Sequence, residues 1–198
     1  MLRKNFIVLI FFVLVISFVA SFTNSHAEDK GKVAIPNITT CAGQELQLNG
    51  YGTRKKLFIK LYVASLYVQE KQSDANQILK MMQASCMRLN IISSKITSEK
   101  LVKATREGFE KATRGNTDPI EAEIKTFLNW LGQPIKKGDV FEFAFIPHQM
   151  THVTKNGKEL GVIESKEFST ALFGIWLGNM PVDKKLKTGL MGIQHTIQ

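Results

Sequence analysis

One stretch of this sequence, residues 50–68, restricts the fold more than any other. It reads GYGTRKKLFIKLYVASLYV and carries a long run of β-branched and aromatic residues from Leu57 to Val68. Apolar side chains occur at both alternating sets of positions in this run, so both faces of an extended strand would be apolar. Such a strand is typical of the interior of a sheet covered on both sides. We therefore expect residues 57–68 to form a central strand.

Three polar side chains lie in or beside this predicted strand. Arg54 precedes it, and Tyr62 and Tyr67 place hydroxyl groups in its apolar surface. A buried hydroxyl requires a hydrogen-bond partner. A guanidinium beside an apolar wall suits a ligand with a carboxylate or carbonyl head and an apolar body. Arg54, Tyr62 and Tyr67 are therefore the candidate ligand-binding residues, and the alternative is a surface arginine with two tyrosines of the core.

The first 27 residues have the layout of a secretory signal peptide. Two basic residues precede an almost purely apolar run over residues 6–22, and Ser25-His26-Ala27 forms a small-x-small site. This order predicts cleavage at about Ala27 and a periplasmic or secreted mature chain. An uncleaved membrane anchor is the alternative, because about 17 apolar residues is the lower limit for a membrane span.

Residues 28–198 are long enough to bury the core of a single domain. Without Arg3 and Lys4 the chain carries 24 basic and 17 acidic residues, a net charge of +7. The excess is spread in short pairs such as Lys55-Lys56, with no arginine-rich stripe and interleaved aromatics, so we expect no nucleic-acid partner. A soluble basic surface explains the charge, and weak contact with anionic headgroups at a membrane surface stays open.

The sequence contains two cysteines, Cys41 and Cys86. In an oxidising compartment an even number of cysteines permits one disulfide. Two buried free thiols are an equally good interpretation, and the sequence does not choose between them.

We expect neither a metal nor a cofactor. His148 and His152 are four residues apart, but they follow Pro147 between predicted strands, and no nearby cysteine or acidic residue completes a metal site. The Gly50-x-Gly52 pair precedes a strand and not a helix, so it lacks the helix N-terminus that receives a nucleotide phosphate.

The rest of the mature chain alternates between predicted helices and strands. Helical spacing and capping residues predict helices over residues 75–83, 98–113, 119–131, 167–177 and 182–191. Alternation predicts further strands over residues 44–49, 86–92, 140–146, 151–155 and 158–163, the last two joined by an Asn156-Gly157 turn. The whole pattern predicts an α+β fold in which helices pack against one face of an antiparallel sheet.

Four segments in order resemble the chalcone isomerase-like proteins of bacteria. They are LNGYGTRKKLFIKLYVASLYV, KKGDVFEFAFIP, VTKNGKELGVI and FSTALFGIWLGNMPVDKKLKTGLMG. The similarity covers residues 46–192, most of the mature chain. It implies an open-faced β-sandwich, a large antiparallel sheet with a layer of helices on one face, and a ligand cleft between the sheet and the helices.

The resemblance also bears on catalysis. The plant isomerases, which close a flavanone ring, carry an arginine at the place of Arg54. Tyr62 and Ile175 stand where those enzymes have threonines, and no tyrosine occurs between Cys86 and Gly115 to match the isomerase tyrosine. Because only the arginine is kept, we do not expect a chalcone isomerase.

An arginine with a tyrosine at these positions is instead similar to the fatty-acid-binding branch of the family, where the pair holds a carboxylate head. We therefore expect an exported, non-catalytic binder of a fatty acid or similar amphiphile, with Arg54 and Tyr62 at the head group. The alternative is an intramolecular lyase or isomerase acting on an enone or phenolic substrate, in which Arg54 is catalytic. A third interpretation is an interaction domain whose cleft is filled by its own side chains.

Overall fold

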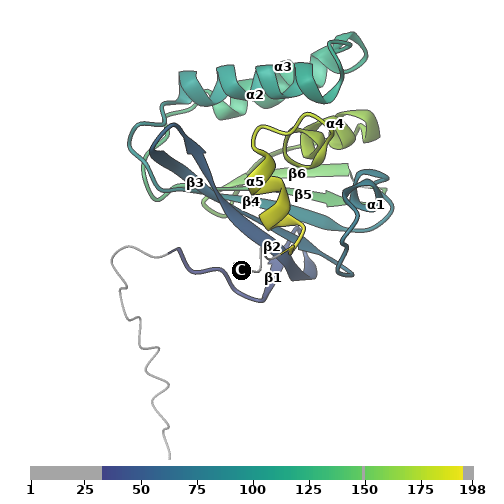
Figure 1. Cartoon of the computed structure of the whole chain (residues 1–198). Helices are drawn as coiled ribbons and strands as arrows, with labels where there is room; N and C mark the ends of the chain where they lie inside the picture. The colour runs from purple at the N-terminus through teal and green to yellow at the C-terminus, as the bar shows by residue number, and fades with distance from the viewer. Residues whose placement is uncertain (1–32, 149, 194–198) are drawn as a thin grey trace, which may run out of the picture. The chain divides into compact units, whose positions relative to one another are not determined.

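A computed structural model of the protein describes residues 33–148 and 150–193. Seven strands form one antiparallel sheet, in which every strand pairs with its neighbours in sequence (Figure 1). Their bounds are β1 Ile38–Cys41, β2 Gln44–Lys56, β3 Ile59–Val68, β4 Ser85–Ile91, β5 Val140–Ile146, β6 Met150–Lys155 and β7 Lys158–Ile163. The sheet is therefore a simple meander with β3, β4 and β5 in its interior.

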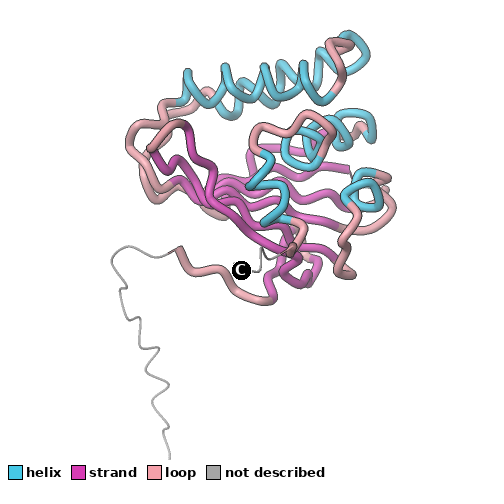
Figure 2. The backbone as a smooth tube through the Cα atoms, in the orientation of Figure 1, coloured by secondary structure: helices cyan, strands magenta, loops and turns pink. Residues whose placement is uncertain are grey.

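The helices lie against one face of the sheet (Figures 1 and 2). Their bounds are α1 Ala75–Leu79, α2 Ser98–Ala112, α3 Glu121–Leu131, α4 Lys166–Leu177 and α5 Lys184–Leu190, with a 3-10 turn, η1, over Asp118–Ile120. α4 packs against α1, α2 and α5, α2 also packs against α3, and α5 lies along β2. Within the described ranges, no helix has both the length and the apolar character that crossing a membrane requires.

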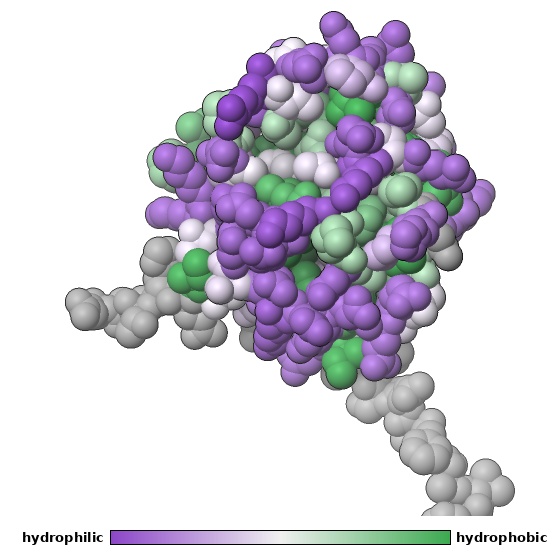
Figure 3. All heavy atoms as spheres, turned by 90° about the vertical axis from the view of Figure 1, so that its right-hand side faces the viewer, coloured by the Kyte–Doolittle hydropathy of each residue, from purple (hydrophilic) through white to green (hydrophobic). Residues whose placement is uncertain are grey.

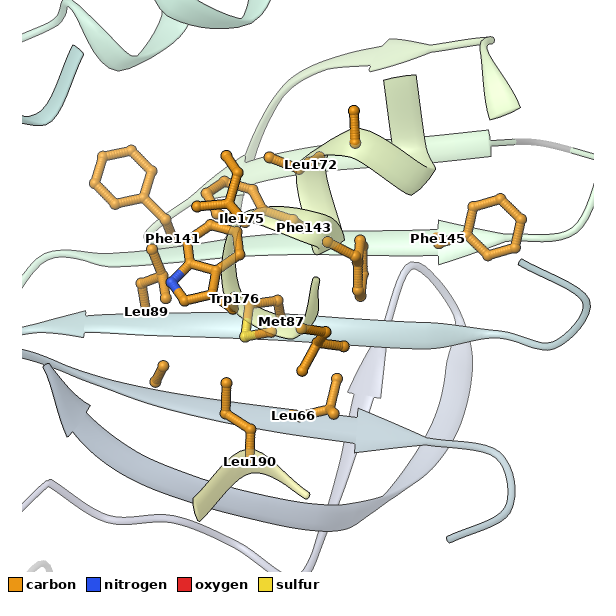
Figure 4. Close-up of a cluster of buried hydrophobic side chains, with 14 of the residues drawn as sticks. Leu66, Met87, Leu89, Phe141, Phe143, Phe145, Leu172, Ile175, Trp176 and Leu190 are labelled. Atoms are coloured by element: carbon orange, nitrogen blue, oxygen red, sulfur yellow. The ribbon is translucent and has the colours of Figure 1, made fainter. Parts of the chain in front are cut away.

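The main core lies between the sheet and these helices. Phe141, Phe143 and Phe145 alternate along β5 and are all buried, as their spacing predicts. In Figure 4 their side chains share this layer with those of α4, and Trp176 stacks on Phe143 with a centroid separation of 6.0 Å. Large aromatic side chains fill this layer, and their packing joins α4 to the sheet.

The predicted central strand is corrected at its beginning. Leu57 and Phe58 form the turn between β2 and β3, and their side chains are 87% and 100% exposed. β2 instead continues through both glycines and Arg54 as far as Lys56. The chain reverses without a glycine, asparagine or proline because Leu57 adopts a left-handed backbone at φ 55°. β3 itself is an interior strand, as predicted.

Smaller differences occur at three helix ends. α1 ends at Leu79 and α5 begins at Lys184, so both are shorter than predicted. The segment expected as one helix from residue 119 begins as the 3-10 turn, and Asp118 provides no side-chain cap there. Prediction from periodicity is least precise at such ends, because a helix frays or tightens there in response to its tertiary neighbours.

The opposite face of the sheet carries a second, smaller buried cluster. It includes Leu46, Tyr67 and Ala144 together with the two cysteines. Cys41 ends β1 and Cys86 lies in β4, and the structure joins them in a disulfide across a sequence separation of 45 residues. Of the two interpretations that the sequence left open, the structure has the bridge.

Candidate functional site

Arg54 and Tyr62 face each other across the β2–β3 ladder. They are direct register partners, and the ladder becomes irregular immediately afterwards, between Arg54 and Lys55. Directly opposed side chains in an antiparallel pair have Cβ atoms about 4.5–5.5 Å apart. Tyr62 belongs to the main core, so this pair lies on the helical side of the sheet.

The guanidinium of Arg54 is bound to a carboxylate of the protein itself. Its Nη1 lies 3.2 Å from Oδ2 of Asp183, and the same nitrogen donates to the backbone carbonyl of Lys55. The Arg54 and Asp183 side chains are 23% and 18% exposed. Asp183 is also the N-cap of α5, because its Oδ1 accepts a hydrogen bond from the backbone N–H of Leu186 at 3.1 Å.

Tyr62 is buried and has one hydrogen bond. Its hydroxyl oxygen accepts from the indole Nε1 of Trp176 at 3.0 Å. Burial raises the pKa of Tyr62 to about 12, against the smaller lowering effects of the Trp176 hydrogen bond and the Arg54 charge. The phenol is therefore protonated at neutral pH. Among the described residues its own hydrogen has no bonded acceptor, so that hydrogen is available to a ligand oxygen.

The alternating glycines of β2 bring α5 to this pair. A Cβ on Gly50 would lie 2.6 Å from the backbone nitrogen of Gly192 and would also overlap the carbonyl oxygen of Gly189. A Cβ on Gly52 would lie 2.9 Å from Cδ1 of Leu186. Only residues without side chains let a helix approach a strand so closely. The Gly-x-Gly pattern thus serves packing, and it positions the capping carboxylate of α5 beside Arg54.

The structure places Tyr67 on the other face of the sheet, away from Arg54 and Tyr62. An odd spacing of five residues along one strand puts Tyr62 and Tyr67 on opposite faces. The ring of Tyr67 instead lies 5.6 Å from the guanidinium carbon of Arg88. Arg88 in turn forms an ion pair with Glu142 at 2.5 Å and donates to Thr39. Tyr67 therefore belongs to a polar network near the disulfide.

Two pockets lie elsewhere. The smaller, about 100 Å³, is beside α1 and β4. The larger, about 480 Å³, lies between α1, the end of α2 and α4; Lys111, Arg114 and Lys166 are among its lining residues. Figure 3 views the side of the molecule that carries α1, where apolar surface is interspersed with polar side chains. Neither of these two pockets is lined by Arg54 or Tyr62.

The histidine pair has a different environment from the one inferred from sequence. Nδ1 of His152 lies 3.1 Å from a carboxylate oxygen of Glu159, an acidic neighbour contributed by the adjacent strand β7. In the part of the chain that the structure describes, the one cluster with metal-ligand spacing consists of Cys41, Cys86 and Glu142. Both sulfur atoms of that cluster are in the disulfide, which removes them as thiolate ligands.

Sequence reasoning missed Asp183 and Trp176. Both lie far from Arg54 in sequence, and only the packing of α4 and α5 on the sheet brings them close. The order Pro181-Val182-Asp183 before a helix is a capping signal that could have identified the aspartate as an ordered carboxylate. No local signal could have paired it with Arg54.

Comparison with known proteins bears on the family and the fold. A sequence model described as chalcone isomerase-like matches residues 27–192. This protein belongs to the chalcone isomerase-like family. The family assignment expected from the four segments is thereby confirmed, as is the open-faced β-sandwich of the α+β class.

Among solved structures, this protein is similar to the fatty-acid binding protein AtFAP1 of Arabidopsis thaliana. The two share 15% sequence identity with a TM-score of 0.62, over 80% of this chain and 91% of that one. At this identity the likeness shows the shared fold. No curated protein matches the sequence.

Proposed function

We propose that this protein is a non-catalytic binder of a fatty acid or similar amphiphile, with Arg54 and Tyr62 holding its carboxylate head. The observation that carries the proposal is the direct pairing of a guanidinium with a phenol that has an unused hydrogen. A guanidinium and a phenol are complementary donors for one carboxylate, and charge-assisted hydrogen bonds of this kind contribute roughly 1.5–3 kcal/mol each.

Asp183 supports this proposal, because it is a carboxylate already bound to Arg54 at 3.2 Å. In our proposal the ligand's carboxylate replaces it at the guanidinium. The adjoining surface on the helical side is apolar and includes Trp176 and Leu89 of the main core (Figure 4). An acyl chain would contact this surface in a conformation with α5 displaced, whose population the ligand increases. The solved relative is a fatty-acid binding protein, which agrees with this class of ligand.

The decisive measurement is the affinity of purified variants for palmitate, by calorimetry below its micelle concentration. Arg54→Gln should weaken binding about tenfold or more, because it removes the cation. Asp183→Asn should tighten binding roughly threefold to tenfold, because asparagine keeps the helix cap but no longer competes for Arg54. The matched control is Arg106→Gln, which breaks the Arg106–Glu121 ion pair, whose partners are 29% and 31% exposed. Equal affinities for Arg54→Gln and Arg106→Gln would contradict the proposal.

The lyase or isomerase alternative has a separate test. The protein is incubated with chalcones, and the absorbance of the enone is followed. A protonated Tyr62 does not act as a base, so we expect no loss of absorbance that depends on Arg54. A loss abolished by Arg54→Gln would favour the enzyme.

We also propose that the mature protein is exported. The expected signal peptide lies outside the described residues, and the family match begins at residue 27, beside the predicted cleavage site. Intact mass of the protein from a periplasmic or culture fraction should correspond to a chain that begins at Glu28. A full-length mass would instead favour the uncleaved anchor.

A further inference from the structure

The turn of the β2–β3 hairpin presents apolar side chains to solvent. Three consecutive residues, Leu57, Phe58 and Ile59, are 87%, 100% and 46% exposed. No other large apolar side chain in the described ranges is as exposed as Leu57 or Phe58. The turn lies at the far end of the long β2–β3 pair (Figure 2). We call residues 55–60 the hairpin tip.

The hairpin tip is basic as well as apolar. Lys55, Lys56 and Lys60 are all exposed and flank the three apolar residues. Residues 46–69 contain no aspartate or glutamate. The tip therefore combines exposed apolar side chains with three lysines, and its own segment of the chain supplies no acidic residue to neutralise them.

The backbone of the tip agrees with a role beyond connecting two strands. Leu57 adopts φ 55°, a conformation that glycine or asparagine normally provides in a two-residue turn. A leucine followed by phenylalanine has neither the conformational freedom nor the polarity that such a solvent-exposed turn favours. An unfavourable local choice that also exposes apolar surface points to a partner for that surface.

We propose that the hairpin tip inserts into the surface of a membrane that contains anionic lipid. Leucine, phenylalanine and isoleucine would enter the boundary between headgroups and acyl chains, and the lysines would meet the lipid phosphates. A protein partner fits less well. A turn of two residues buries little of the roughly 1,000 Å² that a stable protein interface needs, and lysine is depleted from the centre of such interfaces.

This surface lies next to the proposed head-group site. In the β2–β3 ladder Lys55 pairs with Lys60, and the following pair is Arg54 with Tyr62. A membrane-bound tip would hold the Arg54–Tyr62 pair near the headgroup region, where the carboxylates of free fatty acids lie. That exchange step rests on the proposed function, whereas insertion of the tip does not.

The test is co-sedimentation of the protein with vesicles of phosphatidylcholine, alone or mixed with phosphatidylglycerol. We expect binding to the mixed vesicles that weakens with added salt. Phe58→Ser should reduce this binding roughly tenfold. The control is Met82→Ser, which removes an apolar side chain that is 69% exposed elsewhere and should leave binding unchanged.

The charge contribution is tested separately. The triple change Lys55→Gln/Lys56→Gln/Lys60→Gln should weaken binding to mixed vesicles by about fivefold per lysine. The control, Lys71→Gln/Lys80→Gln, neutralises two exposed lysines in the β3–β4 connection, at the opposite end of the sheet. A larger loss of binding per lysine in the hairpin triple than in the control pair supports the proposal. An equal loss per lysine in the two variants overturns it.

Insertion itself is measured with Phe58→Trp. Its additional fluorescence, compared with the wild-type protein, should shift to the blue and be quenched by brominated lipid in mixed vesicles. Absence of wild-type binding, or binding with residue 58 in water, would overturn the proposal. So would an oligomer that Phe58→Ser dissociates without any vesicle binding. Because palmitate affinity is measured without vesicles, failure of either proposal is distinguishable from failure of the other.

Discussion

At neutral pH Tyr62 is a protonated phenol in an apolar environment. Its side chain is 7% exposed, and burial raises its pKa to about 12. The folded state therefore retains a proton that the unfolded chain loses near the ordinary value of 10. A buried neutral phenol beside a guanidinium suits recognition of an anion, since the guanidinium only donates and the phenol has a hydrogen of its own to donate.

The alkaline stability of Tyr62→Phe tests this description. A raised folded-state pKa contributes stability that is complete below pH 10 and disappears as the pH rises to about 12. The wild-type protein should therefore lose roughly 2–3 kcal/mol more than the variant over this interval. At neutral pH the variant should be less stable by about 1–3 kcal/mol, because Nε1 of Trp176 loses its acceptor. Urea unfolding across this pH range measures both effects. Parallel profiles would contradict the raised pKa of Tyr62, and equal stabilities at neutral pH would contradict the role of its hydrogen bond.

The candidate residues also show what sequence resolves at this scale. Arg54 became a candidate through its residue type and the family resemblance, and Tyr62 lies opposite it in the β2–β3 ladder. Tyr67 has the same residue type and the same strand, but side-chain alternation places it on the other face. Residue chemistry alone did not separate the two tyrosines, whereas strict counting along β3 would have done so.

At the scale of elements, the position of α5 depends on the surface of β2. The Gly-x-Gly pattern leaves the helical side of β2 without side chains at residues 50 and 52, and α5 lies directly on the backbone there. The capping aspartate of α5 then reaches Arg54. The Gly50-x-Gly52 pattern, which resembles part of a nucleotide-binding loop, therefore serves here to pack a helix against a strand.

Gly50→Ala should displace α5 and destabilise the protein by about 1–3 kcal/mol, since the new methyl group meets rigid backbone of Gly189 and Gly192. Gly52→Ala should cost less, because its Cβ meets the flexible side chain of Leu186. Thermal unfolding gives both values. Palmitate affinity should also rise in Gly50→Ala if α5 displacement frees Arg54. Equal stabilities of the two variants would show that the backbone of α5 does not pack against Gly50 as described.

Element prediction succeeded where the local signal was strong. β5 matches its predicted bounds, and the Asn156-Gly157 turn joins β6 to β7 with both residues at positive φ, as the dipeptide indicates. The β2–β3 turn was missed because Leu57 and Phe58 continue the apolar pattern of a strand. Hydrophobic periodicity predicts a strand on the assumption that apolar side chains are buried, and these two are exposed.

At the scale of the whole molecule, the disulfide connects strands that are not neighbours in the sheet. Cys41 ends β1 and Cys86 lies in β4, with β2 and β3 between them in strand order. Both sulfur atoms lie on the face opposite the helices, beside Leu46 and Tyr67. The bridge therefore restrains the N-terminal edge of the sheet where no helix covers it.

Reduction of this bridge should destabilise the protein by roughly 3–4 kcal/mol, the chain-entropy value for a separation of 45 residues. The free energy of unfolding in urea, with and without a reductant, measures this. Cys41→Ala/Cys86→Ala should be about as unstable as the reduced protein and insensitive to the reductant. An unchanged midpoint on reduction would show that β1 is held by packing alone.

The sequence by itself determined the class of fold, the family and most element positions, and it predicted the two residues of the candidate head-group site. These depend on side-chain periodicity, turn chemistry and residue type, which are properties of neighbouring positions. Only the tertiary structure decided that Arg54 is paired with Asp183 and that Tyr62 accepts from Trp176. The physical reason is separation along the chain: the Arg54–Asp183 contact joins residues 129 apart, and it forms only when α5 settles on the bare backbone of β2.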